Sequence, residues 1–212
     1  MAHNHDRAQE AHAPIEDHHE LTLYEKRAYA IESLLLEKGV LTADAIRQKL
    51  EEIDAVTPAL GARVVARAWV DVAFKARLLA NAKEAIAELD IDTDAFTILV
   101  AVENTEKVHN VVVCTLCSCY PRAILGLPPD WYKSLSYRSR VVIDPRGVLR
   151  EFGTELPADV EVRVYDSTAD MRYLVIPARP AGTEGMSEEA LAALVTRDSM
   201  IGVAKAREPA MA

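Results

Sequence analysis

Long apolar segments and an excess of positive charge are both missing from this sequence of 212 residues. No uninterrupted apolar stretch approaches the roughly 18 residues of a membrane-spanning helix, so we expect no membrane partner. Lysine and arginine number 24 against 33 aspartates and glutamates, and the net charge of −9 argues against nucleic acid as a partner. Hydrophobic residues make up 50% of the chain and charged residues 27%. This composition is typical of a soluble, globular protein with a sizeable core.

A secretory signal peptide is likewise missing, because the N-terminus is polar and rich in histidine. Together with cysteines that stay reduced, this predicts a cytoplasmic protein. Five of the six histidines lie within residues 1–19. Such a segment could capture metal weakly, but its composition is typical of a solvated leader, and we expect residues 1–19 to be disordered.

Cysteine is scarce, and its three copies fall within six consecutive positions, at Cys114, Cys117 and Cys119. An odd count at these spacings argues against a disulfide framework. Zinc ribbons and iron–sulfur clusters are disfavoured, because the sequence has no second C-x-x-C half and no matching histidine pair downstream. A thioredoxin-like motif would use Cys114 and Cys117 and leave Cys119 unexplained. Buried packing residues and a metal site with three thiolate ligands remain as interpretations, and we expect the metal site.

The backbone is the obvious source of further ligands for such a metal. Cys117 and Cys119 flank the peptide nitrogens of Ser118 and of Cys119 itself, and deprotonated amides would form chelate rings with the two sulfurs. Two thiolates and two amidates would form a square base, with Cys114 on one axial side and an open sixth position for water or substrate. Because ordinary amides do not ionise near neutrality, this arrangement requires a strongly Lewis-acidic ion such as trivalent cobalt or iron.

The first part of the chain, residues 20–90, is predicted to be helical. Its apolar residues recur at helical spacing, and Gly39 is a natural helix stop. Thr42 can cap the second helix. The expected helices cover residues 20–38, 42–53, 58–80 with a break near Asp71, and a segment before Leu89. This part is either an arm that clasps a partner or half of an ordinary helical core.

The second part, residues 91–206, is predicted to mix strands with helices, and residues 207–212 form a tail. Runs of β-branched and aromatic residues predict strands. Ser187 followed by two glutamates is typical of a helix start. The expected strands cover residues 96–102, Val108–Val113, 160–165 and 173–176, and the expected helices cover residues 130–138 and 187–195. The prediction is therefore an α+β fold: an N-terminal helical arm followed by a layered α/β/β/α-type domain that carries the metal site.

The cysteine segment is similar to the metal-binding signature of nitrile hydratase alpha subunits. The resemblance covers roughly residues 20–204 and has many specific segments. These are VCTLCSCYP at 113–121, LGLPP at 125–129, WYK at 131–133, YRSR at 137–140, DPRGVL at 144–149, RVYDS at 163–167, RPAGTEG at 179–185 and VTRDSMIGV at 195–203.

This resemblance implies a metal centre that hydrates nitriles to amides. It implies that Cys114 is the axial ligand, and that Cys117, Ser118 and Cys119 supply the equatorial donors and carry out catalysis. Cys117 would be oxidised to a sulfinate and Cys119 to a sulfenate, whose oxygen would act as nucleophile or base. Thr115 follows the axial cysteine as in the cobalt type, so we expect one low-spin Co(III) per alpha–beta pair, with Fe(III) as the alternative.

The resemblance also implies partners. A separate nitrile hydratase beta subunit would complete an alpha2–beta2 heterotetramer and supply arginines near the sulfur oxygens. An activator protein, or metallochaperone, would insert the cobalt, and the substrate would be a small nitrile.

Several residues outside the cysteine segment are candidates for supporting roles. Arg138 and Arg172 resemble family positions, and each could either face the sulfur oxygens or form a surface ion pair. Asp166 and Ser167 match a segment that supports a beta-subunit tyrosine at the pocket, and the alternative is a turn cap after a strand. His109 precedes the cysteines by five residues, and we expect a hydrogen-bonded core or interface residue rather than a ligand.

One residue departs from the nitrile hydratase pattern. Arg122 stands where many members of the family have tryptophan, so a cation replaces a large apolar wall near the expected pocket. The departure resembles the gamma subunit of thiocyanate hydrolase, in which an anionic substrate is hydrated at the same kind of site. An outward-pointing Arg122 that meets a partner carboxylate is the plainer interpretation. A non-catalytic metal-binding homologue is the third functional class that the sequence leaves open.

Overall fold

The computed structural model describes residues 20–209, and the chain divides into two compact units, residues 1–49 and 50–212. The predicted leader, residues 1–19, lies outside the described residues, as does the end of the predicted tail from residue 210. Within the described part of the chain, no helix is long and apolar enough to cross a membrane.

The first unit contains α1, Leu23–Glu37, and the beginning of α2, Ala43–Ala55. Thr22 and Glu25 form a capping box at the start of α1, because each side chain accepts a hydrogen bond from the backbone amide of the other residue. The hydroxyl of Thr42 caps α2 in the predicted way. Neither helix has a buried residue. Both predicted helices are confirmed, and several of their apolar side chains, including Leu23, Tyr24 and Leu34, are exposed.

The second unit begins with three helices that meet at sharp breaks. These are α3, Ala59–Val70, α4, Val72–Ala80, and α5, Ala82–Ala87. Asp71 ends α3 with extended backbone and then caps α4, because its carboxylate accepts a hydrogen bond from the amide of Phe74 at 2.8 Å. The predicted break near Asp71 is confirmed, and it turns the chain so that α4 and α5 can pack against a strand.

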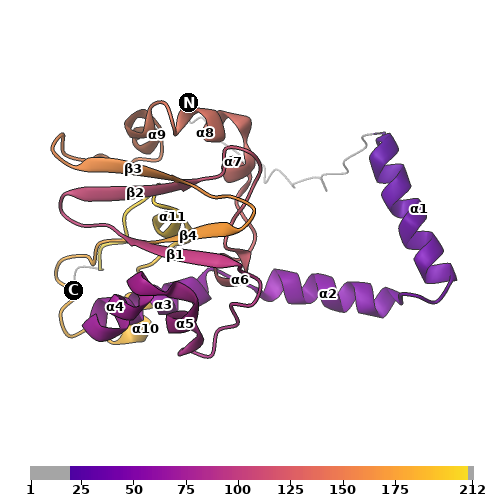
Figure 1. Ribbon diagram of the computed structural model, residues 1–212, viewed down its shortest axis with the longest axis horizontal. Helices are drawn as coiled ribbons and strands as arrows, with labels where there is room; N and C mark the ends of the chain where they lie inside the picture. Colours follow the sequence, from indigo (N-terminus) through magenta and orange to yellow (C-terminus); the bar gives the residue numbers. More distant parts are fainter. Residues whose placement is uncertain (1–19, 210–212) are drawn as a thin grey trace, which may run out of the picture. The chain divides into compact units, whose positions relative to one another are not determined.

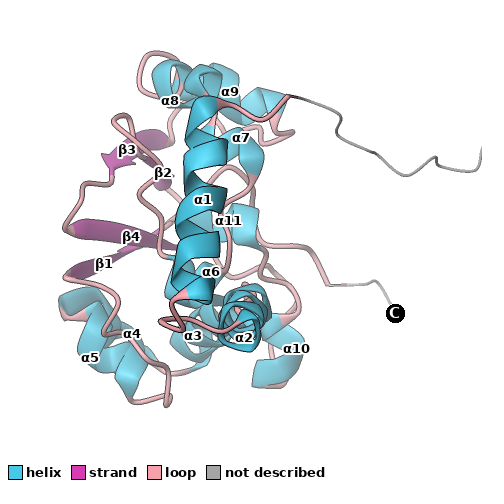
Figure 2. Ribbon diagram, turned by 90° about the vertical axis from the view of Figure 1, so that its right-hand side faces the viewer, coloured by secondary structure: helices cyan, strands magenta, loops and turns pink. Residues whose placement is uncertain are grey.

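Within residues 20–209, four strands form two parallel pairs. They are β1, Ile98–Glu103, β2, Val108–Val113, β3, Glu161–Asp166, and β4, Met171–Ile176. β1 pairs with β4, and β2 pairs with β3. The strand pairs lie between two groups of helices, α3–α5 with α10 on one side and α7–α9 on the other (Figures 1 and 2). The predicted α+β class and its layering are confirmed, with every strand within two residues of its predicted bounds.

Six short helices connect and cover the strands. They are α6, Arg122–Leu125, α7, Asp130–Lys133, α8, Leu135–Arg140, α9, Pro145–Glu151, α10, Glu188–Ala192, and α11, Arg197–Ile201. The single helix predicted over residues 130–138 is wrong, because extended backbone at Ser134 divides it. The Ser134 hydroxyl then caps α8. α6, α9 and α11 were not predicted, since each is too short to show a helical period.

A main hydrophobic core joins the strands to most helices of the second unit, and Ala66, Leu191 and Leu194 form a smaller buried cluster beside it. Buried residues come from α3–α5 and from all of β1, β2 and β4, including Val65, Ile86 and Leu174. The indole of Trp69 donates a hydrogen bond to the carbonyl of Pro177 at 2.8 Å, which joins α3 to the end of β4. The predicted boundaries between the leader, the helical part, the α+β part and the tail, at residues 20, 91 and 207, stay a prediction. The core contains buried residues from both before and after residue 90.

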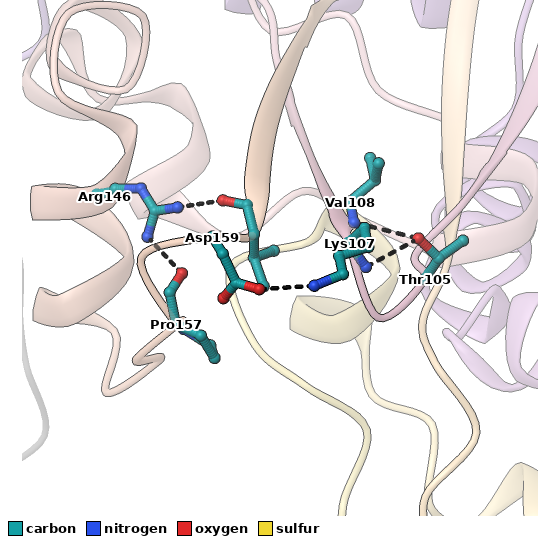
Figure 3. A network of polar contacts seen from close by, with 7 residues as sticks. Thr105, Lys107, Val108, Arg146, Pro157 and Asp159 are labelled. Atoms are coloured by element: carbon teal, nitrogen blue, oxygen red, sulfur yellow. Dashed lines mark hydrogen bonds and ion pairs between the residues drawn. The ribbon is translucent and has the colours of Figure 1, made fainter.

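A polar network fixes the register of β2 against β3 (Figure 3). The Thr105 hydroxyl accepts hydrogen bonds from the amides of Lys107 and Val108, and Lys107 forms an ion pair with Asp159 at 2.6 Å. In the segment before β3, the Arg146 guanidinium donates to the carbonyl of Pro157 at 3.3 Å. The two strands thus begin together, and because they are parallel they also end together, with Val113 opposite Asp166.

His109 is part of a buried polar cluster rather than a ligand site. Its Nε2–H donates to the backbone carbonyl of Gly202 at 2.7 Å, and its Nδ1 accepts from the side-chain amide (Nδ2) of Asn104 at 3.3 Å. Gly202 has a φ of 93°, and a Cβ there would collide with the carbonyl of Asn110. The prediction that His109 is a hydrogen-bonded core residue is confirmed.

The protonation state of His109 should affect stability. Burial, the largest cause, lowers the pKa of His109, and the nearby Lys205 acts in the same direction. The unfolded chain therefore binds the proton more readily than the folded chain. We expect the free energy of unfolding to be highest above about pH 6.5 and to fall as the pH drops below that value. Urea unfolding between neutral and mildly acidic pH measures this.

The variant His109→Ala tests the same cluster. It should lower the free energy of unfolding by about 1–3 kcal/mol at neutral pH, because the Gly202 carbonyl is left buried without a donor. It should also flatten the pH dependence. An unchanged pH dependence in the variant would show that other groups cause it.

Candidate metal centre

The three cysteine sulfurs converge at the edge of the sheet where β2 and β3 end. Residues 114–119, called here the cysteine loop, follow β2 directly. The Sγ atoms of Cys114 and Cys117 are 3.3 Å apart, those of Cys117 and Cys119 are 3.0 Å apart, and all three lie within 4.8 Å of one another. Cys114 is buried, Cys119 is half-buried and Cys117 is exposed. This spacing lets three sulfurs reach one ion.

The backbone of the cysteine loop is arranged around the sulfurs. The amide of Cys117 donates to the sulfur of Cys114 at 3.2 Å. Hydrogen bonds from the thiols of Cys119 and Cys114, followed by smaller contributions from the amides of Ser118 and Cys119, lower the pKa of Cys117. Those two amides donate to no backbone carbonyl within residues 20–209. They are therefore free to join the sulfurs as ligands.

The charge balance of the thiols fits a bound cation. Burial, followed by the neighbouring thiols of Cys117 and Cys114, raises the pKa of Cys119 to about 12. Three thiolates this close together would repel one another strongly at neutral pH. A soft or borderline metal ion removes that repulsion and deprotonates the thiols outright. The donor set, three sulfurs and two amide nitrogens, fits a transition metal.

Two charged side chains hold the start of the cysteine loop. Asp166, at the end of β3, accepts hydrogen bonds from the amide of Thr115 at 2.9 Å and from its hydroxyl at 2.5 Å. Arg138, on α8, donates to the carbonyls of Cys114 at 3.0 Å and Thr115 at 2.7 Å. Asp166 thus supports the cysteine loop of its own chain. Arg138 was expected either to face the sulfur oxygens or to form a surface ion pair, and the structure shows it donating to two backbone carbonyls of the loop instead.

Two buried tyrosines hold the backbone at the two sides of the cysteine loop. The Tyr132 hydroxyl donates to the carbonyl of Cys119 at 2.9 Å, and burial raises the pKa of Tyr132, which keeps the phenol protonated. Tyr137 donates to the carbonyl of Val112 at 2.7 Å. These tyrosines were not among the predicted site residues. Their signal was the segments WYK and YRSR, whose aromatic residues turn inward from α7 and α8.

Ser167 follows Asp166 and completes the edge of the sheet. Its amide donates to the carbonyl of Val113 at 2.7 Å. Its hydroxyl is buried and has no hydrogen-bond partner within the described residues. The structure therefore places Thr115, Asp166 and Ser167 together beside the cysteines, as their candidate supporting roles require.

A pocket of about 540 Å³ opens over the exposed side of the cysteine loop. Its walls come from the loop, from α6 and α7 and from β4. The lining residues include Cys117, Ser118, Cys119, Arg122, Leu127, Asp130, Lys133 and Arg172. Arg122 and Arg172 are thus both brought to the site, whereas His109 lines a different cavity. Cys114 lies beneath, outside the lining.

Comparison with known proteins identifies the family. The sequence profile described as "Nitrile hydratase, alpha chain" matches residues 22–204. The chain belongs to the nitrile hydratase alpha-chain family. The resemblance drawn from the cysteine segment is therefore confirmed.

Individual proteins that this chain is similar to agree with this assignment. The low-molecular-weight cobalt-containing nitrile hydratase subunit alpha of Rhodococcus rhodochrous is 53% identical over 88% of this chain and 90% of its own length. The thiocyanate hydrolase subunit gamma of Thiobacillus thioparus is 41% identical over 87% of this chain and 81% of its own. A solved double mutant of the Fe-type nitrile hydratase from Comamonas testosteroni Ni1 is 41% identical, with a TM-score of 0.82 over 90% of this chain and 94% of that one.

The support that Arg138 gives to the cysteine loop can be tested by Arg138→Lys. A lysine keeps the charge but cannot donate to both carbonyls with the fixed geometry of a guanidinium. We expect the affinity for Co²⁺ to fall by about 10–100-fold, the usual effect of losing a group that orients metal ligands. Titration of the sulfur-to-cobalt absorption band measures it.

The matched control is Arg140→Lys on the same helix. Arg140 forms an exposed ion pair with Glu151, and within the described residues its side chain donates no hydrogen bond to the cysteine loop. Its variant should bind Co²⁺ as the wild type does. Equal losses in the two variants would show that Arg138 acts through the general stability of α8.

Proposed function

We propose that this chain is the metal-binding alpha subunit of a cobalt nitrile hydratase, which hydrates nitriles to amides together with a separate beta subunit. The observation that carries the proposal is the convergence of three sulfurs at the floor of a pocket, beside two backbone amides that donate to no backbone carbonyl within residues 20–209. Cobalt is favoured over iron because Thr115 follows the axial cysteine and because a relative at 53% identity is cobalt-containing. The Fe-type structure is less similar, at 41% identity.

The residues of the cysteine loop take distinct roles in this proposal. Cys114, Cys117 and Cys119 bind Co(III) through sulfur, and Ser118 and Cys119 bind it through backbone nitrogen. Bound there, the ion supplies a Lewis acid that makes a nitrile carbon or a water molecule more reactive. Cys114 is buried and anchors the ligand set, while the loop residues that line the pocket face the incoming substrate.

Oxidation of the two cysteines that line the pocket, by an external oxidant such as dioxygen, would add the reactive oxygens. A sulfinate at Cys117 and a sulfenate at Cys119 are successive rungs of the cysteine oxidation series, and both sulfurs are accessible from the pocket. The sulfenate oxygen of Cys119 would then act as base toward a water that attacks the nitrile carbon, or as nucleophile toward that carbon, in which case a water must afterwards restore the sulfenate as the amide leaves. Tyr132 fixes this residue by donating to its carbonyl.

The site needs a partner to close it. Leu116, at the tip of the cysteine loop, is 85% exposed, and Cys117 beside it is exposed as well. An apolar tip next to reactive sulfurs is unfavourable in water. A beta subunit that covers the loop in an alpha2–beta2 heterotetramer would bury the apolar Leu116 side chain and shield the Cys117 sulfur from water. An activator protein that inserts cobalt and a cytoplasmic location complete the proposal.

A second candidate function is that of the metal-binding subunit of a thiocyanate hydrolase. Arg122 in the pocket and the 41% identity to a thiocyanate hydrolase gamma subunit favour it. Release of carbonyl sulfide and ammonia from thiocyanate, without amide formation from nitriles, would establish this alternative.

Metal analysis with intact mass is the primary test. The alpha–beta complex, co-expressed with its genomic neighbours, should contain about one cobalt per pair and should carry added oxygen atoms on Cys117 and Cys119. It should form amides from small nitriles. Stoichiometric zinc with no hydration activity in the matured complex would contradict the proposal, and unmodified cysteines in metal-loaded protein would favour a non-catalytic homologue.

The variant Cys119→Ala tests the assignment of the ligands. It removes one sulfur donor and the sulfenate oxygen, so nitrile hydration should be abolished even where some metal is retained. Ser118→Ala is the comparison, since it keeps the backbone nitrogen and should retain the metal and measurable activity. Turnover near the wild-type rate in Cys119→Ala would refute the role of this sulfur.

A further inference from the structure

The hydroxyl of Ser167 is a buried donor next to the metal centre that has no role so far. Ser167 is 1% exposed, and its Oγ has no hydrogen-bond partner within residues 20–209. A buried hydroxyl costs free energy until it finds a partner, because burial removes it from water. Since Ser167 is already buried within this chain, a partner subunit does not reach it. Its acceptor therefore lies among the groups around it.

Strand pairing places Ser167 beside Cys114. The last register pair of β2 and β3 is Val113 with Asp166, and the amide of Ser167 then donates to the carbonyl of Val113 at 2.7 Å. The next pair along the same parallel ladder is therefore Cys114 with Ser167. Paired residues of neighbouring strands project from the same face of the sheet, and successive residues alternate between the faces.

The exposure of the side chains agrees with this alternation. Asp166 is exposed and reaches the half-buried Thr115, which lies two residues beyond its own register partner and so on the same face. Cys114 and Ser167 are each 1% exposed, as expected for the opposite, inner face. The axial sulfur and the free hydroxyl thus project together into the interior beneath the cysteine loop.

The hydroxyl of Tyr132 is a shared neighbour of these two residues. Burial is the largest cause of the raised pKa of Tyr132, the Ser167 hydroxyl beside it acts in the opposite direction, and the charges of Cys114 and Cys119 raise the pKa further. Tyr132 has committed its own proton to the carbonyl of Cys119 at 2.9 Å. The proton of Ser167 remains uncommitted close to the sulfurs.

The buried hydroxyl of Tyr120 is a useful contrast. It also has no hydrogen-bond partner within the described residues. The charged groups that act on its pKa are Arg197 and Asp198 at the start of α11, and no thiol is among them. Of these two buried hydroxyls, the one on Ser167 is therefore the one that stands next to a metal ligand.

We propose that Ser167 is a positioning residue of the metal centre, and that its hydroxyl donates a hydrogen bond to the sulfur of Cys114 once that sulfur is a metal-bound thiolate. This rests on the proposed function, which makes Cys114 a ligand. A thiol sulfur is a weak acceptor, whereas an ionised acceptor forms hydrogen bonds about twice as strong as a neutral one does. Rotation about the Cα–Cβ bond of Ser167 is enough to direct the proton.

Such a hydrogen bond would tune the ligand as well as orient it. A donated proton draws electron density from the sulfur, so the thiolate gives less of it to the ion. Hydrogen bonds around a ligand sulfur are a recognised means by which proteins adjust a bound metal. Cys114 already accepts from the amide of Cys117 at 3.2 Å, and Ser167 would add a second donor from the interior.

The test is sulfur K-edge absorption of the cobalt-loaded alpha–beta complex. In the proposed function Cys117 and Cys119 are oxidised, so Cys114 is the thiolate that remains on the metal, and its pre-edge peak lies apart in energy from those of oxidised sulfur. Ser167→Ala removes the donor. The pre-edge peak per bound cobalt should therefore grow, and the sulfur-to-cobalt band should move to longer wavelength. Ser167→Gly is a second variant without the hydroxyl if Ser167→Ala does not assemble.

The matched control is Ser199→Ala, the same substitution at a fully buried serine on α11. The Ser199 hydroxyl donates to the carbonyl of Thr196 at 2.8 Å, so this variant should lower the urea midpoint of the full chain and leave both cobalt signals unchanged. Ser167→Ala should do the reverse. Without metal it removes a buried hydroxyl that has no partner, so the midpoint should stay the same or rise.

Unchanged pre-edge and band in Ser167→Ala, or in Ser167→Gly, would overturn the proposal. A lower urea midpoint of metal-free Ser167→Ala would overturn it as well, because the hydroxyl would then have a partner in the chain itself. In either case nitrile hydration by the wild-type complex would show that the proposed function stands.

Failure of the proposed function has its own signs. If intact mass shows Cys117 and Cys119 unmodified, the enzyme assignment fails, and the change in thiolate pre-edge between wild type and Ser167→Ala still decides the role of Ser167. If the wild-type complex binds no cobalt, the proposed function and this inference fail together.

Discussion

The mutual repulsion of three thiolates is the constraint on which this site depends. Sulfurs within 4.8 Å of one another cannot all be ionised at neutral pH unless a cation lies between them. The protein must therefore hold a loop in an arrangement that is unfavourable until metal binds. Asp166, Arg138 and Tyr132 do so through the backbone and the Thr115 side chain rather than through the sulfurs. The sulfurs, and the amides of Ser118 and Cys119, stay available for the ion.

The fold supplies these supports through strand pairing. Because β2 and β3 are parallel and begin together, their carboxyl ends meet at one edge, and this brings Asp166 to Thr115 across 51 positions of sequence. The helices α7 and α8 pack at the same edge and contribute Tyr132 and Arg138. The polar network at Thr105 and Lys107 lies at the opposite end of β2 (Figure 3) and still bears on the metal centre, since a shift in register would move every support.

Burial divides the cysteines into two kinds. Cys114 is sealed beneath the loop, where oxidants and substrates do not reach it, while Cys117 and Cys119 face the pocket. The arginines also differ in place, since Arg138 donates to carbonyls of the cysteine loop and Arg122 lines the pocket above it. In the proposed enzyme, in which a beta subunit completes the active site, the exposed Leu116 belongs to the surface that this subunit would cover.

The sequence by itself determined the metal site, the strand positions and the longer helices. The donors Cys114, Cys117 and Cys119 are neighbours in sequence, and a strand of six residues shows its own pattern. It did not determine which strands pair, where the helix at residues 130–138 divides, or what Tyr132, Arg138 and Asp166 contact. Those contacts join residues 13 to 51 positions apart. Only the tertiary structure decides them, because local patterns record burial and turns but not which distant backbone group a buried side chain will reach.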